Sequence, residues 1–597
     1  MSRIFATTIQ YSQEDMYKKH LLLNKFGKVE RNAIGRVPNC VEFIDDKDKA
    51  CFLDDIYVVI DGNLTNRKEL VGLLDEKSDV RDCELIAKLY RSRKTDLLYF
   101  INGNYSIVLY DAKIGKLFGI RDRLGNKPLF YHYSKNGIEL CSQLFPICIG
   151  NKFDINSEAR KLYWIMQHIP EPYSIISQIS KLEAGCYFEY DLPENSLAVH
   201  RYWDVTYNTN RYQIPESFGE ARNVADTLIR DSVKSNLLPD GKVAVYLSGG
   251  IDSSLIALYL KKLDANVQSL SISFDIPNFN ETEYAAKVAR QLEIPFSDIR
   301  MSANNFSEII DDISYYYDEP MGDPSAIPTC FINKQAGGAF DQAFGGDGGD
   351  EFFLGYRRYR YAQLRHKYPV FFIPAALALY KLKLRDYGVR FGQKSDVDYI
   401  LHLLLGEKIA PFINYDPDHL LKSIEAIEYL TNQKELSKGF SNFEIKTNCQ
   451  YAYGVKTERA SNRYGVDFRG PILDYKVLEY SRCIPDKYLY SFYEQKLVLR
   501  KILYDHVDKT LFERAKRGFS CPIGFWLRNE LKEYLFDTIN EDALAGIEEL
   551  NINSVLNMRD QHCNGTVDYA DVLWRLIHYT LWYRTYIKLN QDFNSNL

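Results

Sequence analysis

The chain lacks several features that would place it in a particular class of protein. Its eleven cysteines include neither a Cys-x-x-Cys pair nor a metal-ligand spacing. No signal peptide is recognised, so we expect reduced thiols in a cytoplasmic protein. The longest apolar run, Val370 to Tyr380, is short and contains Pro374, so it cannot span a bilayer. A net charge of −6 offers no general attraction to nucleic acid or to anionic membranes.

The length requires more than one domain, because 597 residues are too many for a single hydrophobic core. The first 150 residues are rich in short strands. Apolar and β-branched runs between Gly, Asn and Asp turn signals predict strands at 56–60, 105–110, 116–120 and 129–133. Two helical patterns interrupt them, at 67–74 and 83–91, and residues 150–215 form a connector with further short strands.

From about residue 216 strands alternate with helices. The pattern predicts helices at 217–236, 253–263 and 281–292, with strands at 243–247 and 267–274. Such alternation implies a parallel sheet with helices on its faces. After about residue 355 the chain is mostly helical. We therefore predict two domains, residues 1–214 and residues 215–597, in a combined α/β and α+β fold.

The most informative stretch is the octapeptide Leu-Ser-Gly-Gly-Ile-Asp-Ser-Ser at 247–254. It lies between a predicted strand and a predicted helix, where backbone N–H groups can cradle phosphate. Gly249 and Gly250 let the backbone approach an anion closely. The side chains of Ser248, Ser253 and Ser254 add hydroxyl donors. No Lys follows the glycines, so this is not the Walker pattern. A plain turn with Ser as helix N-cap is the alternative interpretation.

A second glycine-rich loop reads Phe-Gly-Gly-Asp-Gly-Gly-Asp-Glu-Phe-Phe at 344–353. This composition suits neither a helix nor a strand, so we expect a tight loop after a strand. Its acids, Asp347, Asp350 and Glu351, would then point into a cleft. Acids beside a phosphate loop repel a nucleotide unless a divalent cation lies between them. Asp252 and Asp350 are therefore the magnesium candidates, and a solvated or calcium-like turn is the alternative.

From about residue 55 to 530 the chain resembles the asparagine synthetase family. Seven motifs carry the resemblance, in the family's order: Leu-Ser-Gly-Gly-Ile-Asp-Ser-Ser (247–254), Phe-Asn-Glu-Thr-Glu-Tyr-Ala (279–285), Asp-Glu-Pro (318–320), Asp-Pro-Ser-Ala-Ile-Pro-Thr (323–329), Gly-Asp-Gly-Gly-Asp-Glu (346–351), Arg-Gly-Pro-Ile-Leu-Asp (469–474) and Arg-Ala-Lys-Arg-Gly-Phe (514–519). The segment Gly-Ile-Arg-Asp-Arg-Leu-Gly-Asn-Lys-Pro-Leu-Phe-Tyr at 119–131 resembles the family's glutaminase domain.

This resemblance implies an amino-terminal Ntn-hydrolase-like αββα sandwich. It implies a carboxy-terminal adenine-nucleotide α-hydrolase-like domain, a parallel sheet with helices on both faces. The implied reaction uses ATP and Mg²⁺: a carboxylate attacks the α-phosphate, pyrophosphate leaves, and an amine displaces AMP to form an amide. By the same resemblance, Lys516 is a catalytic lysine and Asp347 a general base. Adenosine would contact Leu247, Ile272, Gly345 and Gly346.

The amino-terminal half departs from the family at its glutaminase site. The chain begins Met1-Ser2-Arg3, where the family has Met-Cys-Gly. The family's Asn-Gly-Glu reads Asp61-Gly62-Asn63, which puts a negative side chain where negative charge must develop. No Arg-containing segment that clamps the glutamine carboxylate is found before residue 60. Because only Asp82 still matches a glutamine-binding position, we predict a scaffold without glutaminase activity.

The substrates stay open at this point. Degraded glutaminase domains also occur in β-lactam synthetases and lasso-peptide cyclases, although Asp347 stands where a β-lactam synthetase has tyrosine. Arg463 and Tyr464 depart from the family's Asp-Arg-Ala-Ser-Met-Ala segment, which fits either a changed acceptor or altered helix packing. A non-catalytic nucleotide-binding paralogue is a further alternative. We expect a small-molecule or peptide carboxylate and an amine as partners, without nucleic acid or membrane. A homodimer, or a precursor peptide with its leader-processing protease, stays open.

Overall fold

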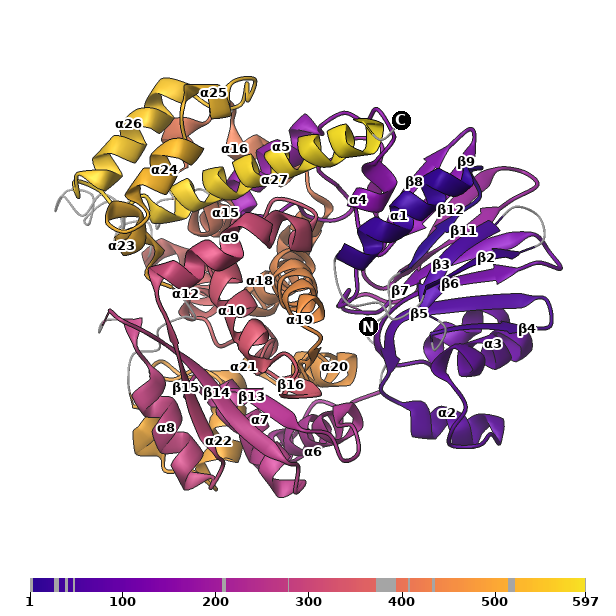
Figure 1. The fold of residues 1–597 in the computed structure, drawn as a ribbon. Helices are drawn as coiled ribbons and strands as arrows, with labels where there is room; N and C mark the ends of the chain where they lie inside the picture. The colour runs from indigo at the N-terminus through magenta and orange to yellow at the C-terminus, as the bar shows by residue number, and fades with distance from the viewer. Residues whose placement is uncertain are drawn as a thin grey trace.

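The structure is a computed structural model that describes residues 4–25, 32–37, 41–46, 49–206, 211–276, 279–371, 393, 395–405, 409–431, 435–513 and 521–595. It contains two domains, each built on its own sheets (Figure 1). Among the described residues no helix is both long and apolar enough to cross a membrane. Most of the apolar run at 370–380, residues 372–380, lies outside the described ranges.

The amino-terminal domain stacks two antiparallel six-stranded sheets. One sheet has the order β10-β8-β9-β1-β3-β2 and the other β12-β11-β7-β6-β5-β4. The strand bounds are β1 Phe5–Thr7, β2 Asn32–Val37, β3 Val41–Asp46, β4 Ala50–Leu53, β5 Ile56–Leu64, β6 Gly103–Asp111, β7 Lys116–Arg121, β8 Phe130–Ser134, β9 Gly137–Cys141, β10 Ser180–Lys181, β11 Cys186–Asp191 and β12 Ser196–Arg201. The four strands predicted in this half all form.

Helices cover the outer faces of both sheets and complete an αββα sandwich (Figure 1). On one side α3 packs on β4 and β5, and on the other α4 packs on β9 and on α1. Alternate residues of facing strands, such as Val59, Val108 and Leu140, form the apolar layer between the sheets. The helix bounds are α1 Gln13–Lys25, α2 Arg67–Leu74, α3 Asp82–Arg93, η1 Lys94–Tyr99, α4 Phe145–Cys148 and α5 Ser157–Met166.

The carboxy-terminal domain is built on a parallel five-stranded sheet in the order β15-β14-β13-β16-β17. Its strands are β13 Val243–Tyr246, β14 Val267–Phe274, β15 Phe296–Met301, β16 Gln342–Phe344 and β17 Asp467–Arg469. Helices lie on both faces of this sheet, as expected from the alternating pattern (Figure 1). One face carries α6 Phe218–Asn236, α7 Ile251–Lys262, α8 Thr282–Gln291 and α22 Leu497–Tyr504; the other carries α9 Ala303–Tyr317 and α10 Ala326–Ala336.

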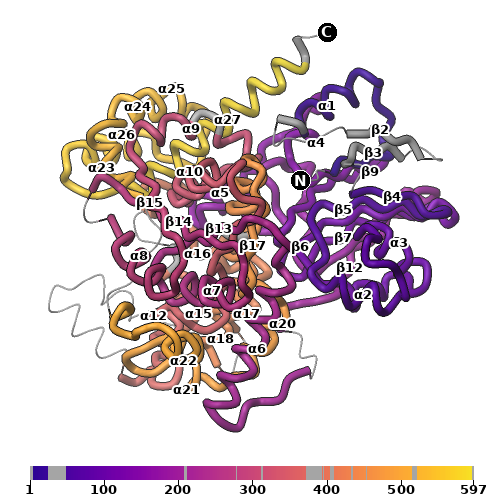
Figure 2. Tube along the Cα trace, turned by 60° about the horizontal axis from the view of Figure 1, so that its bottom comes forward, coloured from indigo at the N-terminus to yellow at the C-terminus, as the bar shows by residue number. Residues whose placement is uncertain are grey.

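The remainder of this domain is helical and joins the two domains. The bounds are α11 Gly349–Phe352, α12 Arg357–Lys367, α15 Asp396–Leu405, η3 Ala410–Phe412, α16 Pro417–Lys422, η4 Glu425–Ile427, α17 Glu428–Thr431, α18 Leu436–Glu444, the π-helix η5 Ile445–Thr457, α19 Glu458–Arg463, α20 Tyr475–Cys483, α21 Asp486–Leu489, η6 Lys509–Phe512, α23 Ile523–Arg528, α24 Lys532–Thr538, α25 Glu541–Leu544, α26 Ile552–Cys563 and α27 Ala570–Ser595. Helix α27 runs toward α1 and α4 of the other domain (Figures 1 and 2).

Candidate active site

The two glycine-rich loops leave neighbouring strands of the parallel sheet. Strands β13 and β16 pair in parallel, with Val243 opposite Gln342 and Val245 opposite Phe344. Because both strands end at the same edge, residues about a hundred positions apart emerge side by side. This edge is where ligands bind in open parallel sheets.

The loops touch through their backbones. A Cβ placed on Gly346 would lie 2.5 Å from the Ser253 nitrogen and 2.6 Å from the Asp252 carbonyl carbon. Such distances leave no room for a side chain, which explains why glycine occupies this position. The two loops therefore converge at one edge of the sheet.

A cleft of about 1360 Å³ opens at this junction. The residues predicted from the sequence that line it are Leu247, Ser248, Gly250, Asp252, Ser253, Ile272, Gly345, Gly346, Asp347 and Asp350. Two others do not line it. Gly249 has φ +69° and packs on the backbone of Tyr284 and Ala285, and Ser254 is fully buried in α7. Lys516 lies outside the described residues.

The first loop ends in a helix start that presents polar groups to the cleft. Helix α7 begins at Ile251, two residues earlier than predicted, because Gly250 takes an extended conformation and serves as its N-cap. The Ser248 and Ser253 hydroxyls lie 3.0 Å apart, and the Gly250 N–H donates to Ser248 Oγ at 3.3 Å. Helix N-termini carry partial positive charge and unpaired N–H donors, so this end suits a phosphate.

Asp252 and Asp350 are held together by a buried lysine that the sequence motifs did not reveal. The Lys496 ammonium pairs with Asp252 Oδ2 and, at 2.7 Å, with Asp350 Oδ1. Lys496 is 5% exposed and stands at the N-cap of α22, with φ 56°. No local signal distinguishes it, because a lysine before an amphipathic helix is ordinarily solvated.

The same acid pair fits a divalent cation. Asp252 Oδ1 is buried and accepts no hydrogen bond from the described residues, so a lone pair is available to a metal. Among those residues no cluster of three or more His, Cys, Asp or Glu could enclose an ion. Asp252 and Asp350 would bind magnesium in its usual mode, in which one or two carboxylates act together with substrate phosphates and water.

Glu351 lines the cleft, as predicted, and is almost fully buried. Residues 349–352 form the single turn of α11 instead of continuing the expected tight loop, because Gly348 adopts φ 87° and starts a helix. Glu351 is 4% exposed and accepts a hydrogen bond from Tyr356 Oη at 2.9 Å. Burial, with the nearby Asp350 and Glu444 carboxylates, raises the pKa of Glu351 to about 7.

We expect Glu351→Gln to remove a pH-dependent loss of stability. Between about pH 4.5 and 7 the folded state keeps a proton on Glu351 that the unfolded state has lost, so the free energy of unfolding falls as pH rises. A pKa shift of this size lowers the free energy of unfolding by up to about 3 kcal/mol across this pH range. Urea unfolding midpoints at pH 5 and pH 8 measure this pH dependence of stability. Glu530→Gln, at an exposed position, is the control and should keep the pH dependence of the wild type. An unchanged pH slope in Glu351→Gln would contradict the assignment.

Arg463 and Tyr464 pack against a neighbouring helix. The Arg463 guanidinium lies 4.9 Å from the centre of the Tyr316 ring, and the Tyr464 ring meets the same ring edge-on at 6.3 Å. Neither residue lines the cleft. Their contacts with α9 favour the helix-packing interpretation over a changed acceptor site.

The residues at the positions of the family's glutaminase motif form ion pairs and hydrogen bonds within the protein. Asp61 is 1% exposed and lies 3.8 Å from the Lys127 ammonium, which also pairs with Glu458 Oε1 of the other domain at 3.0 Å. Asp82 accepts from the Leu64 N–H at 3.0 Å and pairs with Arg67 at 2.6 Å. Ser2 lies outside the described residues.

Comparison with known proteins agrees with this architecture. Residues 224–584 match the asparagine synthase family and residues 52–203 the glutamine amidotransferase domain family. Asparagine synthetase (glutamine-hydrolyzing) 1 of Bacillus subtilis is 26% identical over 549 residues, covering 88% of this chain and 85% of that protein. A putative asparagine synthetase (glutamine-hydrolyzing) 2 of Methanocaldococcus jannaschii is 31% identical over 377 residues, covering 60% of this chain and 70% of that protein.

A more distant relative is amidase chyE of Penicillium rubens, 22% identical over 569 residues, covering 84% of this chain and 82% of that protein. The asparagine synthase match alone spans more than half of the chain. The protein therefore belongs to the asparagine synthase family, whose members form amide bonds at the expense of ATP.

Proposed function

We propose that the protein activates a carboxylate as an acyl-adenylate and couples it to an amine, releasing pyrophosphate and AMP. A carboxylate oxygen attacks the α-phosphorus of ATP, and the bond to the bridging oxygen of pyrophosphate breaks. The amine nitrogen then attacks the activated carbonyl carbon, and AMP leaves as the amide forms. The contact between the two glycine loops, with Asp252 and Asp350 beside a helix N-terminus, is the observation that carries this proposal.

In the first step, different residues of the cleft would bind the phosphates and the magnesium ion. The start of α7 and the Ser248 and Ser253 hydroxyls would bind the phosphates, because each offers donors to an anion. Asp252 and Asp350 would hold Mg²⁺, which would neutralise charge on the leaving pyrophosphate. Lys496 already carries a positive charge between these two acids and would add to that neutralisation.

The second step requires a base and a cation near the carbonyl. Asp347 lines the cleft next to Gly346 and would take the proton released by the attacking amine. Lys516 would stabilise the negative charge of the tetrahedral intermediate. Leu247, Ile272 and Gly345 would contact adenosine through apolar surface and backbone.

Pyrophosphate release tests the proposal directly. The full-length protein with ATP and Mg²⁺ is expected to release pyrophosphate only when a suitable carboxylate is added, and to form AMP in equal amount. Aspartate with ammonium tests the asparagine-type reaction, and peptides with a free amino terminus and an acidic side chain test a macrocyclase. Formation of ADP and phosphate instead would overturn the adenylation mechanism. ATP binding without any turnover would favour a nucleotide-binding paralogue.

We also propose that the amino-terminal domain does not hydrolyse glutamine. Support comes from Asp61, which by the resemblance replaces the family's oxyanion-hole asparagine, and from Asp82, which pairs with Arg67. With no ammonia from glutamine, the amine would be free ammonia or an amine carried by a substrate.

Incubation with glutamine is therefore expected to yield no glutamate above the uncatalysed background, measured by a coupled glutamate dehydrogenase assay. Ser2→Ala should leave amide synthesis unchanged. Glutamate formation that disappears in Ser2→Ala would contradict the assignment of an inactive domain.

A further inference from the structure

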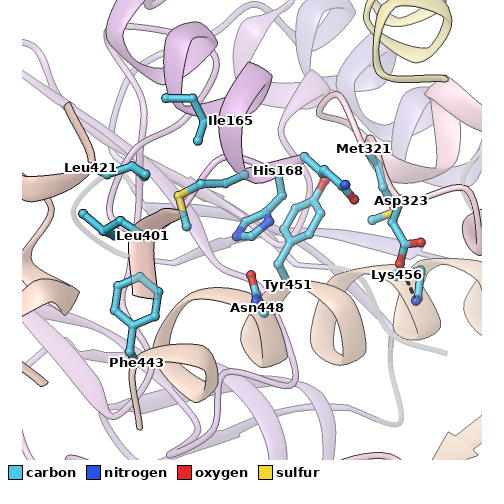
Figure 3. A pocket seen from close by; sticks show the side chains of 12 residues that line it. Ile165, His168, Met321, Asp323, Leu401, Leu421, Phe443, Asn448, Tyr451 and Lys456 are labelled. Carbon is cyan, nitrogen blue, oxygen red and sulfur yellow. Dashed lines mark hydrogen bonds and ion pairs between the residues drawn. The ribbon is translucent and has the colours of Figure 1, made fainter. Parts of the chain in front are cut away.

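A second cavity adjoins the cleft and is lined by no residue of either glycine loop. Figure 3 shows the side chains that line it. Its volume is about 220 Å³, larger than the roughly 150 Å³ at which an apolar cavity holds a benzene-sized ligand. Apolar side chains from both domains form much of its wall, contributed by Ile165, Met321, Leu401, Leu421 and Phe443. Each of these side chains is at most 2% exposed.

One ring nitrogen in this cavity makes no hydrogen bond with the described residues. His168 is 4% exposed, and its Nε2 atom makes no hydrogen bond with the described residues. The imidazole is fixed by stacking on Tyr451, with ring centres 4.6 Å apart and planes inclined by 19° (Figure 3). A buried nitrogen without a partner destabilises a protein, so this atom is available to a polar ligand atom or to a water molecule.

The cavity is electrically neutral. Burial and the Lys181 cation lower the pKa of His168 to about 4, so the imidazole is uncharged near pH 7. The two charged residues of the wall neutralise each other, because the Lys456 ammonium pairs with Asp323 Oδ2 at 2.7 Å. An isolated ammonium or carboxylate would lose its hydration here without gaining a counter-charge.

The cavity adjoins the nucleotide cleft through Lys456, which lines both. Its ammonium also contacts Ser325 Oγ at 2.7 Å, and Ser325 is itself part of the cleft wall. Asn448, Tyr451 and Lys456 all come from η5, a π-helix of 13 residues. Such helices are rare and concentrate at functional sites.

We propose that this cavity binds a neutral, apolar side group of one of the two amide-forming substrates, with a single hydrogen-bonding atom directed at His168. The inference rests on the proposed function and narrows its substrates to those that carry a branched aliphatic or aromatic group. Ammonia and acetate would leave the cavity unfilled.

The test compares Leu421→Trp, which fills the cavity, with Leu420→Trp on the same helix, whose side chain does not line it. Probes are two series: acetate, isovalerate and 3-phenylpropionate, and ammonium, isoamylamine and phenethylamine. Calorimetry of the full-length protein without ATP measures binding. Pyrophosphate release measures kcat/KM and the KM for ATP.

The larger members of one series are expected to bind wild type at least about tenfold more tightly than its smallest member. Leu421→Trp should remove this preference, while the KM for ATP and the behaviour of Leu420→Trp stay unchanged. If the carboxylate series shows this preference, the side group belongs to the carboxylate substrate. If the amine series shows it, the side group belongs to the amine substrate. Equal binding across both series, as for a cavity that holds only water, would overturn the proposal.

His168→Leu gives a second test should the tryptophan variant fold poorly. It is expected to weaken binding of the para-hydroxy analogue of the preferred aromatic probe by about tenfold relative to the unsubstituted probe. An unchanged ratio would overturn the role of His168. Binding is measured without turnover, so a failure of the cavity assignment is distinguished from a failure to release pyrophosphate, which would instead refute the proposed function.

Discussion

Asp252→Asn is expected to reduce substrate-dependent pyrophosphate release by about 10³-fold or more, which is the largest effect anticipated for a single substitution in this protein. Asp252 stands in the first turn of α7, and its Oδ2 pairs with Lys496 while its buried Oδ1 has no partner among the described residues. Replacing the carboxylate by an amide removes the charge that would hold magnesium on the leaving phosphates, yet preserves the size of the side chain.

The measurement is initial-rate pyrophosphate release at saturating ATP and varied Mg²⁺. Asp231→Asn is the matched control, because Asp231 is an exposed helical aspartate that pairs only weakly with Arg230 at 3.5 Å. That control should retain wild-type activity. Near-normal turnover of Asp252→Asn would refute the magnesium assignment, whereas a high rate restored only at raised Mg²⁺ would support it.

Lys496→Met is expected to lower the stability of the metal-free protein by about 3–5 kcal/mol. The substitution leaves Asp252 and Asp350 facing each other in a largely buried position without the cation that now pairs with both. Added Mg²⁺ should then stabilise the variant more than wild type, because an ion can take the place of the lost ammonium. Denaturant unfolding midpoints with and without Mg²⁺ measure both effects.

Lys501→Met supplies the control on the same helix. Lys501 is about half exposed and pairs with Asp505 at 2.6 Å, a surface contact worth about 1 kcal/mol or less. If both lysine variants lost the same stability, the buried acid pair would not be the source of the effect. A Lys496→Met protein that is indifferent to Mg²⁺ would argue against a metal at this pair.

Local sequence patterns were sufficient to predict many of the strands and helices of the two domains. The strands at 105–110, 116–120 and 267–274 and the helices at 67–74 and 217–236 were predictable because hydrophobic periodicity and turn residues act over a few positions. The strand–turn–helix context of 247–254 follows from the same signals. It placed Asp252 at a helix start, although α7 begins two residues earlier than expected.

The departures from the family's glutaminase motif could also be recognised at single positions, but the contacts of these residues could not. Asp61 was identifiable as a misplaced charge from the sequence alone. That it lies near Lys127, and that Lys127 pairs with Glu458 more than 300 positions away, depends on how the two domains pack.

The sequence by itself therefore determined the family, the order of the motifs and the acids that face the cleft, because these depend on short contiguous patterns. Tertiary structure alone decided that Lys496 pairs with Asp252, 244 positions away, and with Asp350, that Glu351 is buried, and that His168 lines a cavity with η5. The physical reason is that burial and ion pairing are set by contacts between distant segments, and no local periodicity encodes which distant side chain arrives at a given charge.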